Sequence, residues 1–231
     1  MLTQTVAGDR PAAMIKVLAV DDDAFMRDLL HRVLTSAGMQ VACHGSAAEL
    51  LATNDLMHAT VLLLDVNLPG ISGLDLQALL TRRGADLPVV FISGAADLAM
   101  AVTAMRHGAA DFIEKPFEAA VLVDRLRRAV AHHADHAVAA PDAADPAVVA
   151  RFDTLTPRER EVFGLLVTGM SSKLIARDLG CSYRTVEVHR AQIMRKMNAR
   201  HLPELVRMSI ESLAPREARA RLVGVRRIVA P

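Results

Sequence analysis

Acidic residues follow two of the apolar runs in this 231-residue sequence. Three consecutive aspartates, residues 21–23, come directly after residues 15–20, and Asp65 comes directly after residues 59–64. Runs of consecutive aliphatic residues are typical of strands that are buried on both faces of a parallel sheet. An acid in such a place can simply end a strand, so the role of Asp65 depends on what else lies near it.

Two further polar residues stand at equivalent places later in the chain. Ser93 follows the apolar run 88–92, and Lys115 comes shortly after the run 111–113. The carboxyl ends of parallel strands meet at one edge of the sheet, and open α/β sheets bind their ligands there. We therefore expect the aspartates, the serine hydroxyl and the lysine ammonium to converge.

Such a group of side chains suits phosphoryl transfer. Several carboxylates close together repel one another, which pushes each toward its protonated form unless a positive charge compensates. Mg²⁺ is a hard cation that binds one or two carboxylates together with water and phosphate oxygens. With a carboxylate nucleophile, this metal, an ammonium and a hydroxyl donor, the site has what an incoming phosphoryl group requires.

The pattern of apolar residues predicts the elements that position these groups. Five strands alternate with five helices, which predicts βαβ units and a five-stranded, doubly wound parallel sheet in the α/β class. The strands are expected at residues 15–20, 40–43, 59–64, 88–92 and 111–113. The helices are expected near residues 25–38, 46–54, 73–83, 97–106 and from 118 into the 130s.

Composition limits the class of protein. The N-terminus lacks the basic and apolar regions of a signal peptide, and no apolar run reaches the roughly 20 residues of a membrane span. The two cysteines, Cys43 and Cys181, have no metal-binding or redox spacing, which favours a reduced cytoplasmic location. Residues 1–149 carry 11 Lys and Arg against 18 Asp and Glu, whereas the remainder carries 16 against 8. The basic second half suggests that it binds a polyanion.

That second half has an all-helical pattern, with four expected helices. Thr156 is expected to cap the first, Ser171 or Ser172 the second and Ser182 the third, which runs to about Met197. A fourth helix is expected at about 202–213. Two helices joined by a glycine-containing turn, with the second longer and basic, are typical of a helix-turn-helix that binds DNA.

Helical geometry divides the third of these helices into two faces. At 100° per residue, Val186, Ile193 and Met197 share a face that is expected to pack inward, with Tyr183 near its edge. The opposite face and its margins can contact base edges or phosphates. The expected DNA-contacting residues are Arg184, Thr185, Glu187, Val188, Arg190, Ala191, Arg195 and Lys196.

The first half resembles the CheY-like receiver domain of two-component response regulators over residues 14–131. The resemblance rests on the aspartates 21–23, on Asp65 with the Leu-Pro-x-x-x-Gly motif of residues 68–73, on Ser93-Gly94 and on the Lys-Pro-Phe motif of residues 115–117. It implies that Asp65 accepts the phosphoryl group and that Ser93 and Lys115 contact it. Phe112 stands at the aromatic switch position, and the Lys115–Pro116 bond is expected to be cis. The implied Mg²⁺ ligands are Asp22, Asp65, the backbone carbonyl of Asn67 and, through water, Asp21.

The second half resembles the LuxR-type output domain of the NarL/FixJ family, in particular its FixJ branch. The resemblance rests on the motifs at residues 155–161, 173–176 and 184–190. The expected domains are a receiver at 14–131, a linker at 132–150, a helix-turn-helix domain at 151–213 and a basic tail at 214–231. The implied protein is a transcriptional regulator rather than an enzyme, with slow autodephosphorylation only. Its implied partners are a sensor histidine kinase, double-stranded promoter DNA, a second copy of itself after phosphorylation, and RNA polymerase.

Two alternatives remain at this point. Asp21-x-Asp23 after a strand also occurs in phosphatases similar to haloacid dehalogenases, in which the first aspartate is the nucleophile. Such an enzyme would leave the DNA-binding half unexplained. The other alternative is a regulator whose receiver is no longer phosphorylated and instead responds to a ligand or a protein.

Overall fold

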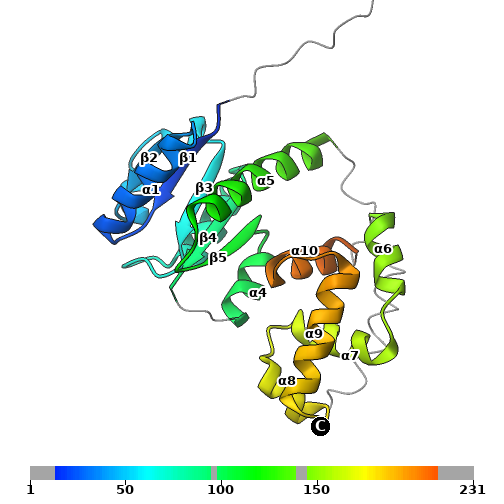
Figure 1. Ribbon diagram of the computed structural model, residues 1–231. Helices are drawn as coiled ribbons and strands as arrows, with labels where there is room; N and C mark the ends of the chain where they lie inside the picture. Colours follow the sequence, from blue (N-terminus) through cyan, green and yellow to red (C-terminus); the bar gives the residue numbers. More distant parts are fainter. Residues whose placement is uncertain (1–13, 95–97, 139–144, 213–231) are drawn as a thin grey trace, which may run out of the picture.

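The computed structural model describes residues 14–94, 98–138 and 145–212. Its first part contains a parallel sheet with strand order β2-β1-β3-β4-β5, as the alternating pattern predicts (Figure 1). The strands are β1 (Lys16–Val20), β2 (Gln40–His44), β3 (Val61–Asp65), β4 (Val89–Ser93) and β5 (Asp111–Glu114). The helices are α1 (Ala24–Ser36), α2 (Ala47–Leu51), the 3₁₀ helix η1 (Asp55–His58), α3 (Gly73–Arg82), α4 (Leu98–Arg106) and α5 (Ala119–Val138).

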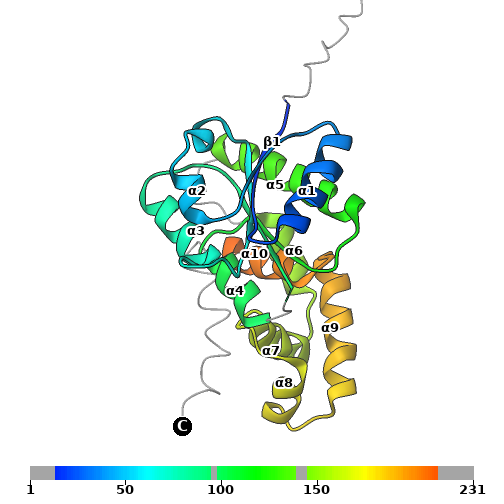
Figure 2. The ribbon, with the colours of Figure 1, turned by 90° about the vertical axis from the view of Figure 1, so that its left-hand side faces the viewer.

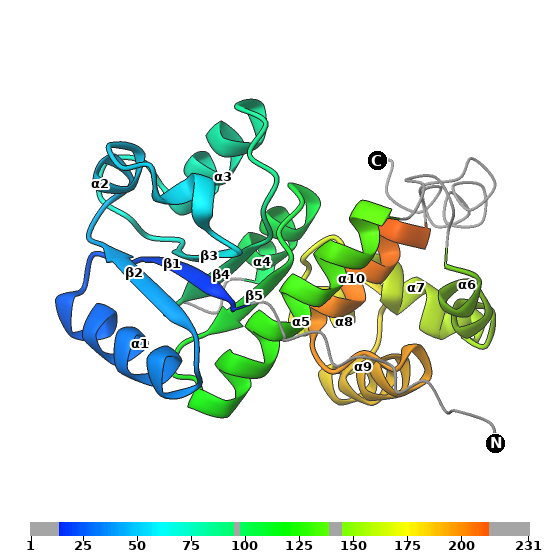
Figure 3. The same cartoon turned by 90° about the horizontal axis from the view of Figure 1, so that it is seen from above.

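Both faces of the sheet are covered, as Figure 3 shows when the molecule is seen from above. Helices α1 and α5 bury Leu30 and Leu122 against one face of the sheet. Helices α2, α3 and α4 cover the other face, where α2 and α3 bury Leu50 and Leu76. Because β3 lies in the middle of the sheet, all five of its residues are buried, including Asp65. The sequence therefore places the acid at the centre of the carboxyl edge.

The second part is helical. It contains α6 (Pro146–Asp153), α7 (Pro157–Leu166), α8 (Ser172–Asp178), α9 (Tyr183–Met197) and α10 (Leu202–Ser212). Thr156 and Glu159 form a reciprocal capping box at the start of α7, and the side chains of Ser171 and Ser182 cap α8 and α9. No helix in the described part of the chain is long and apolar enough to cross a membrane.

The region expected to be a linker, residues 132–150, could be helical in its first half, and it departs from this prediction only at its second end. Helix α5 continues to Val138, and residues 146–150 belong to α6, a fifth helix of the second part. Asp145 caps α6 with its side chain, Pro146 occupies its first turn, and Val148 is buried in the core. With one buried apolar residue, α6 has no helical periodicity that could be recognised in a sequence rich in alanine and proline. The basic tail at 214–231 lies outside the described residues.

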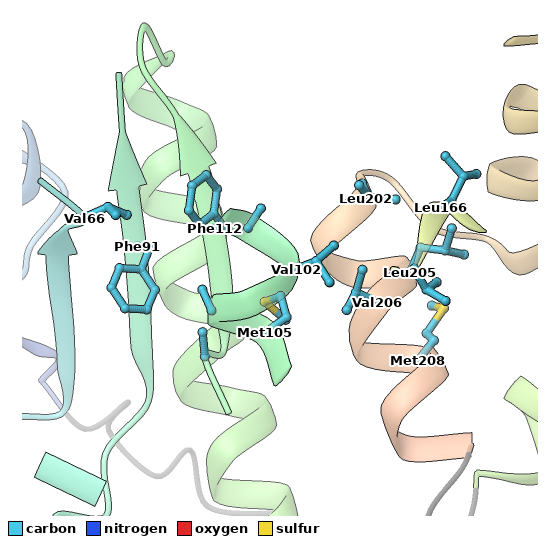
Figure 4. Close-up of a cluster of buried hydrophobic side chains, with 14 of the residues drawn as sticks. Val66, Phe91, Val102, Met105, Phe112, Leu166, Leu202, Leu205, Val206 and Met208 are labelled. Atoms are coloured by element: carbon cyan, nitrogen blue, oxygen red, sulfur yellow. The ribbon is translucent and has the colours of Figure 1, made fainter. Parts of the chain in front are cut away.

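The two parts share one apolar interface. Helix α10 packs against α4, and Figures 1 and 2 both show the two helices side by side. In the close-up of Figure 4, Val102 and Met105 of α4 face Val206 of α10, whereas Leu205 lies on the side of α10 toward Leu166. The loop after α7 also lies close, since a Cβ at Gly169 would stand 2.9 Å from the Cα of Ala99. The apolar core on this side of the sheet is therefore continuous between the two parts.

Candidate functional site

Four of the predicted groups meet at the carboxyl edge of the sheet. The ammonium of Lys115 lies 2.7 Å from Oδ2 of Asp21 and 2.6 Å from Oδ2 of Asp65. Asp21, Asp22 and Asp65 each place a carboxylate oxygen within 4.8 Å of the others. Asp21 and Asp65 are buried, whereas Asp22 is exposed at the mouth of the pocket. The sequence prediction of a converging acidic pocket is confirmed in its geometry.

Backbone groups fix the two buried carboxylates. Oδ1 of Asp65 accepts a hydrogen bond from the Asn67 amide at 2.9 Å, and Oδ1 of Asp21 accepts one from the Asp23 amide at 3.0 Å. Asp23 itself is exposed and caps α1 by accepting from the Phe25 amide. It therefore stabilises a helix end and does not belong to the cluster of three carboxylates.

One residue that the sequence reasoning missed, Arg27, and the glycine of the motif at residues 68–73 hold this edge in place. The guanidinium of Arg27 donates to the carbonyl oxygens of Asp21 and Asp22, at 2.8 and 2.9 Å. Gly73 packs so closely below the pocket that a Cβ there would collide with the carbonyl oxygen of Asp65. The only sequence signal for these hydrogen bonds is that Arg27 lies in the first turn of α1. Many surface arginines occupy such a position, so the signal is not specific.

Electrostatics make the pocket ready for a cation. Burial raises the pKa of Asp21, against the hydrogen bond from Lys115, and the charge of Asp65 adds to the rise. Burial opposes the charge of Lys115, but its hydrogen bonds to the two aspartates raise its pKa overall. One ammonium among three carboxylates leaves negative charge in excess, and oxygen donors are what Mg²⁺ prefers. The residues present therefore fit a magnesium ion.

The two expected switch residues lie on neighbouring strands. Ser93 is fully buried at the end of β4, and its carbonyl accepts from the Lys115 amide at 2.7 Å. Phe112 of β5 is 6% exposed, with its ring centroid 6.4 Å from that of Phe91 (Figure 4). The ring is thus already covered in this arrangement. The Lys115–Pro116 peptide bond is cis, as expected.

Helix α9 presents the two faces that its periodicity predicts. Val186, Ile193 and Met197 are at most 1% exposed and pack against the neighbouring helices. The expectation for Tyr183 is wrong, because this side chain is 52% exposed. It occupies the first turn of α9, where it lines a cleft toward the receiver instead of the helical core.

The residues expected to contact DNA are not equivalent in the structure. Arg184, Thr185, Val188, Ala191 and Arg195 are exposed along α9. Lys196 instead donates to the buried carboxylate of Glu159 at 2.6 Å and to the carbonyl of Thr154 at 3.2 Å. Although burial opposes it, this ion pair helps to lower the pKa of Glu159. Lys196 therefore has a structural role that its sequence position did not reveal.

Comparisons with known proteins agree with both halves. Residues 17–127 match the response regulator receiver domain, and residues 153–209 match the bacterial regulatory proteins of the luxR family. The transcriptional regulatory protein FixJ of Azorhizobium caulinodans is 42% identical over 85% of this chain and 92% of its own length. FixJ of Rhizobium meliloti is 44% identical over 83% of this chain and 93% of its own.

Another relative and a solved structure extend this likeness. Nodulation protein W of Bradyrhizobium diazoefficiens is 40% identical over 84% of both chains. The low-resolution structure of the response regulator StyR is 36% identical, with a TM-score of 0.50, over 86% of this chain and all of that one. The chain therefore belongs to the response regulators that join a receiver domain to a LuxR-type DNA-binding domain, which is the domain composition of a transcriptional regulator.

Proposed function

We propose that Asp65 is the phosphoacceptor through which this regulator is switched. The observation that carries the proposal is the pairing of Asp65 with the Lys115 ammonium at 2.6 Å, beside Asp21 and Asp22, on a chain with a helix-turn-helix. A sensor histidine kinase is the donor that the receiver family implies. The haloacid-dehalogenase-like alternative is disfavoured because it assigns no role to the LuxR-type half.

The proposed reaction forms an acyl phosphate. A carboxylate oxygen of Asp65 attacks the phosphorus of a phosphohistidine, the P–N bond breaks, and the electron pair returns to the imidazole of the kinase. The Lys115 ammonium then pairs with phosphoryl oxygens, and the Ser93 hydroxyl donates to another. Asp22, Asp65, the Asn67 carbonyl and, through water, Asp21 would hold Mg²⁺, which would supply positive charge to neutralise the transferred group. The phosphoryl group is lost again by slow hydrolysis.

We infer that the arrangement of the two domains is the resting, unphosphorylated one. Helix α10 covers the α4 face of the receiver, so a second receiver cannot bind that face at the same time. Glu187 and Arg190 of α9 line a cleft of about 640 Å³ together with Glu114 and Arg125 of the receiver. Part of the proposed DNA-contacting surface thus faces the receiver. Both observations favour a closed state that binds DNA weakly.

Phosphorylation would then exchange one contact for another. The phosphoryl group adds roughly −1.5 to −2 of charge to the buried pocket. Ser93 moves toward the phosphoryl group, and the ring of Phe112 moves into the space that Ser93 vacates. This movement changes the shape of the α4–β5 face. Helix α10 leaves this face and a second receiver occupies it, which brings two copies of α9 to adjacent half-sites. The proposed DNA contacts are Arg184, Thr185, Glu187, Val188, Arg190, Ala191 and Arg195.

Three further expectations complete the proposal. The homodimer forms only after phosphorylation, and RNA polymerase is the partner through which bound protein alters transcription. We keep a cytoplasmic location as a prediction, because a protein that binds promoters must reach DNA. Domain limits of 14–131 and 151–213 stay predictions as well, with α6 added to the second domain.

A small-molecule phosphodonor tests the proposed function directly. The full chain is incubated with acetyl phosphate and Mg²⁺, and its phosphorylation, molecular mass and binding to randomised duplex DNA are measured with and without the donor. We expect acid-stable, base-labile phosphate on one aspartate, a doubled mass and selection of a two-fold symmetric sequence. DNA binding that is the same with and without the donor, with no phosphate incorporated, would instead support the alternative of an unphosphorylated receiver.

Arg207→Ala is expected to raise DNA binding without phosphorylation. The Arg207 guanidinium of α10 donates to the Ala110 carbonyl of the receiver at 3.3 Å. Loss of a hydrogen bond from a charged group costs about 1.5–3 kcal/mol, so the closed state should be depleted severalfold or more. Arg200→Ala is the matched control, because Arg200 meets Asp124 across the same interface at 4.0 Å and is largely exposed. Equal effects of both substitutions, measured by gel shift, would contradict the closed-state proposal.

A further inference from the structure

One imidazole lies between the two domains. His201 immediately precedes α10, and its Nε2 stands 3.6 Å from Oδ2 of Asp111 in β5. Its Nδ1 accepts a hydrogen bond from the Glu204 amide at 3.2 Å, which caps the first turn of α10. A ring nitrogen that accepts from an amide carries no proton, so the proton is on Nε2, the nitrogen nearest to Asp111. This contact therefore requires the neutral imidazole.

The neighbourhood of His201 is rich in positive charge. Arg125 of α5 donates to the Phe112 carbonyl at 2.9 Å and lies 3.5 Å from Asp111. The charged groups that face the imidazole are Asp111 of β5, Arg125 and Arg128 of α5, and Glu204 and Arg207 of α10. Farther along the cleft lie Glu114, Lys173, Tyr183, Glu187, Arg190 and Arg200. Of the five nearest groups, three are arginines, and two of these belong to the receiver.

We propose that His201 is an acid-sensitive latch, whose neutral imidazole allows α10 to dock beside β5 and whose protonation releases the helical domain from the receiver. This inference rests on the proposed closed state and adds a second input to it. A protonated imidazole would place its new Nδ1 proton against the Glu204 amide and its charge beside Arg125 and Arg128. Undocking moves the imidazole away from Arg125 and Arg128 of the receiver and exposes it to water.

The direction of the effect follows from the two states of the imidazole. In the docked state burial, reinforced by Arg125, Arg207 and Arg128, lowers the pKa of His201 to about 3. In an undocked state the ordinary value of about 6.5 is the reference. Above that value both states hold a neutral ring and docking is unaffected. As pH falls below it, the undocked state gains a proton, and the titration of His201 alone weakens docking by about tenfold at pH 5.5.

Protonation of Asp111 has the opposite effect on docking and has to be distinguished from protonation of His201. Burial raises its pKa to about 6, so protonation of Asp111 favours the state in which it is buried. Its hydrogen bond from the Phe112 amide and its contact with Arg125 lie within the receiver and persist after undocking. Asp111→Asn removes this titration while His201 remains. It is therefore expected to make the acid response steeper.

Docking can be measured in the full-length protein by energy transfer between dyes on two introduced cysteines. Cys43 and Cys181, which pack partly buried against the two cores, are replaced by alanine. The exposed substitutions Asp28→Cys in α1 and Asp178→Cys in α8 then carry a donor and an acceptor dye that report interdomain distance. Energy transfer is measured without phosphodonor from pH 7.5 to pH 5.5. In the wild type we expect transfer to fall as pH falls. His201→Asn keeps an acceptor for the Glu204 amide but cannot titrate, so its energy transfer should not fall with pH. The remaining titration of Asp111 can only raise it.

The possible outcomes separate the latch from the function on which it rests. Energy transfer that does not fall with pH in either the wild type or Asp111→Asn, or a His201→Asn variant with the wild-type response, would overturn the latch. DNA binding induced by acetyl phosphate at pH 7.5 is measured on the same samples and tests the proposed function independently. Acid undocking that leaves unphosphorylated DNA binding unchanged would uphold the latch and reject the inhibitory role of the closed state.

Discussion

Asp65→Asn is expected to abolish phosphate incorporation from acetyl phosphate, together with the dimerisation and DNA binding that phosphorylation induces. The amide has nearly the shape of the carboxylate and can still accept from the Asn67 amide, so the fold of the edge should survive. It lacks the anionic oxygen that attacks phosphorus, and an amide is too weak a nucleophile to replace it. Incorporation of radiolabelled phosphate and sedimentation of the same sample measure both losses.

Asp23→Asn is the matched control for this substitution. It makes the same chemical change two residues from the pocket's Asp21, at an exposed residue that caps α1, and asparagine caps a helix about as well as aspartate. We expect it to incorporate phosphate like the wild type. Full incorporation in Asp65→Asn would show that another residue is the acceptor. Steady turnover of a phosphate ester that is lost in Asp21→Asn but kept in Asp65→Asn would favour a phosphatase.

Much of the receiver could be predicted from sequence because its signals are local. Strands β3 and β4 are apolar in every residue before the last, and β1 is apolar after Lys16. The topology then brings Asp21, Asp65 and Lys115 to one edge without further information. Cap residues gave the starts of α7 and α9 for the same reason, since an N-cap and its partner are three residues apart.

The contacts that sequence could not predict are those between distant residues with ordinary side chains. Lys196 was expected to contact phosphate, yet it pairs with Glu159, 37 positions away. Arg207 binds the carbonyl of Ala110 across 97 positions. Neither contact follows from a spacing in the sequence that recurs between proteins. A basic residue on a helix looks the same in sequence whether it contacts DNA or another part of the protein. The packing of α10 on α4 is hidden in the same way, because an apolar helix face does not reveal what covers it.

Arg184→Ala is expected to cause the largest loss of sequence-specific binding among substitutions in α9. Arg184 is exposed in the first turn of this helix, where recognition helices contact base edges in the major groove. A guanidinium that contacts a guanine through two hydrogen bonds contributes about 1–3 kcal/mol of discrimination. Affinity of the phosphorylated protein for its selected sequence should therefore fall on the order of 10- to 100-fold, with relaxed preference at one position of each half-site.

Arg190→Ala provides the contrast, because it removes the same positive charge from the same helix. Arg190 lies 3.9 Å from Glu187 at the margin of the exposed face, where a phosphate contact is expected. Its loss should weaken binding to selected and random duplexes by the same factor. The slope of log affinity against log salt concentration should become shallower by the amount expected for about one phosphate contact. If the two substitutions lower the ratio of selected to random binding equally, Arg184 does not contact bases. The face of α9 used for recognition would then have to be reassigned, with Val188 and Ala191 as the next residues to vary.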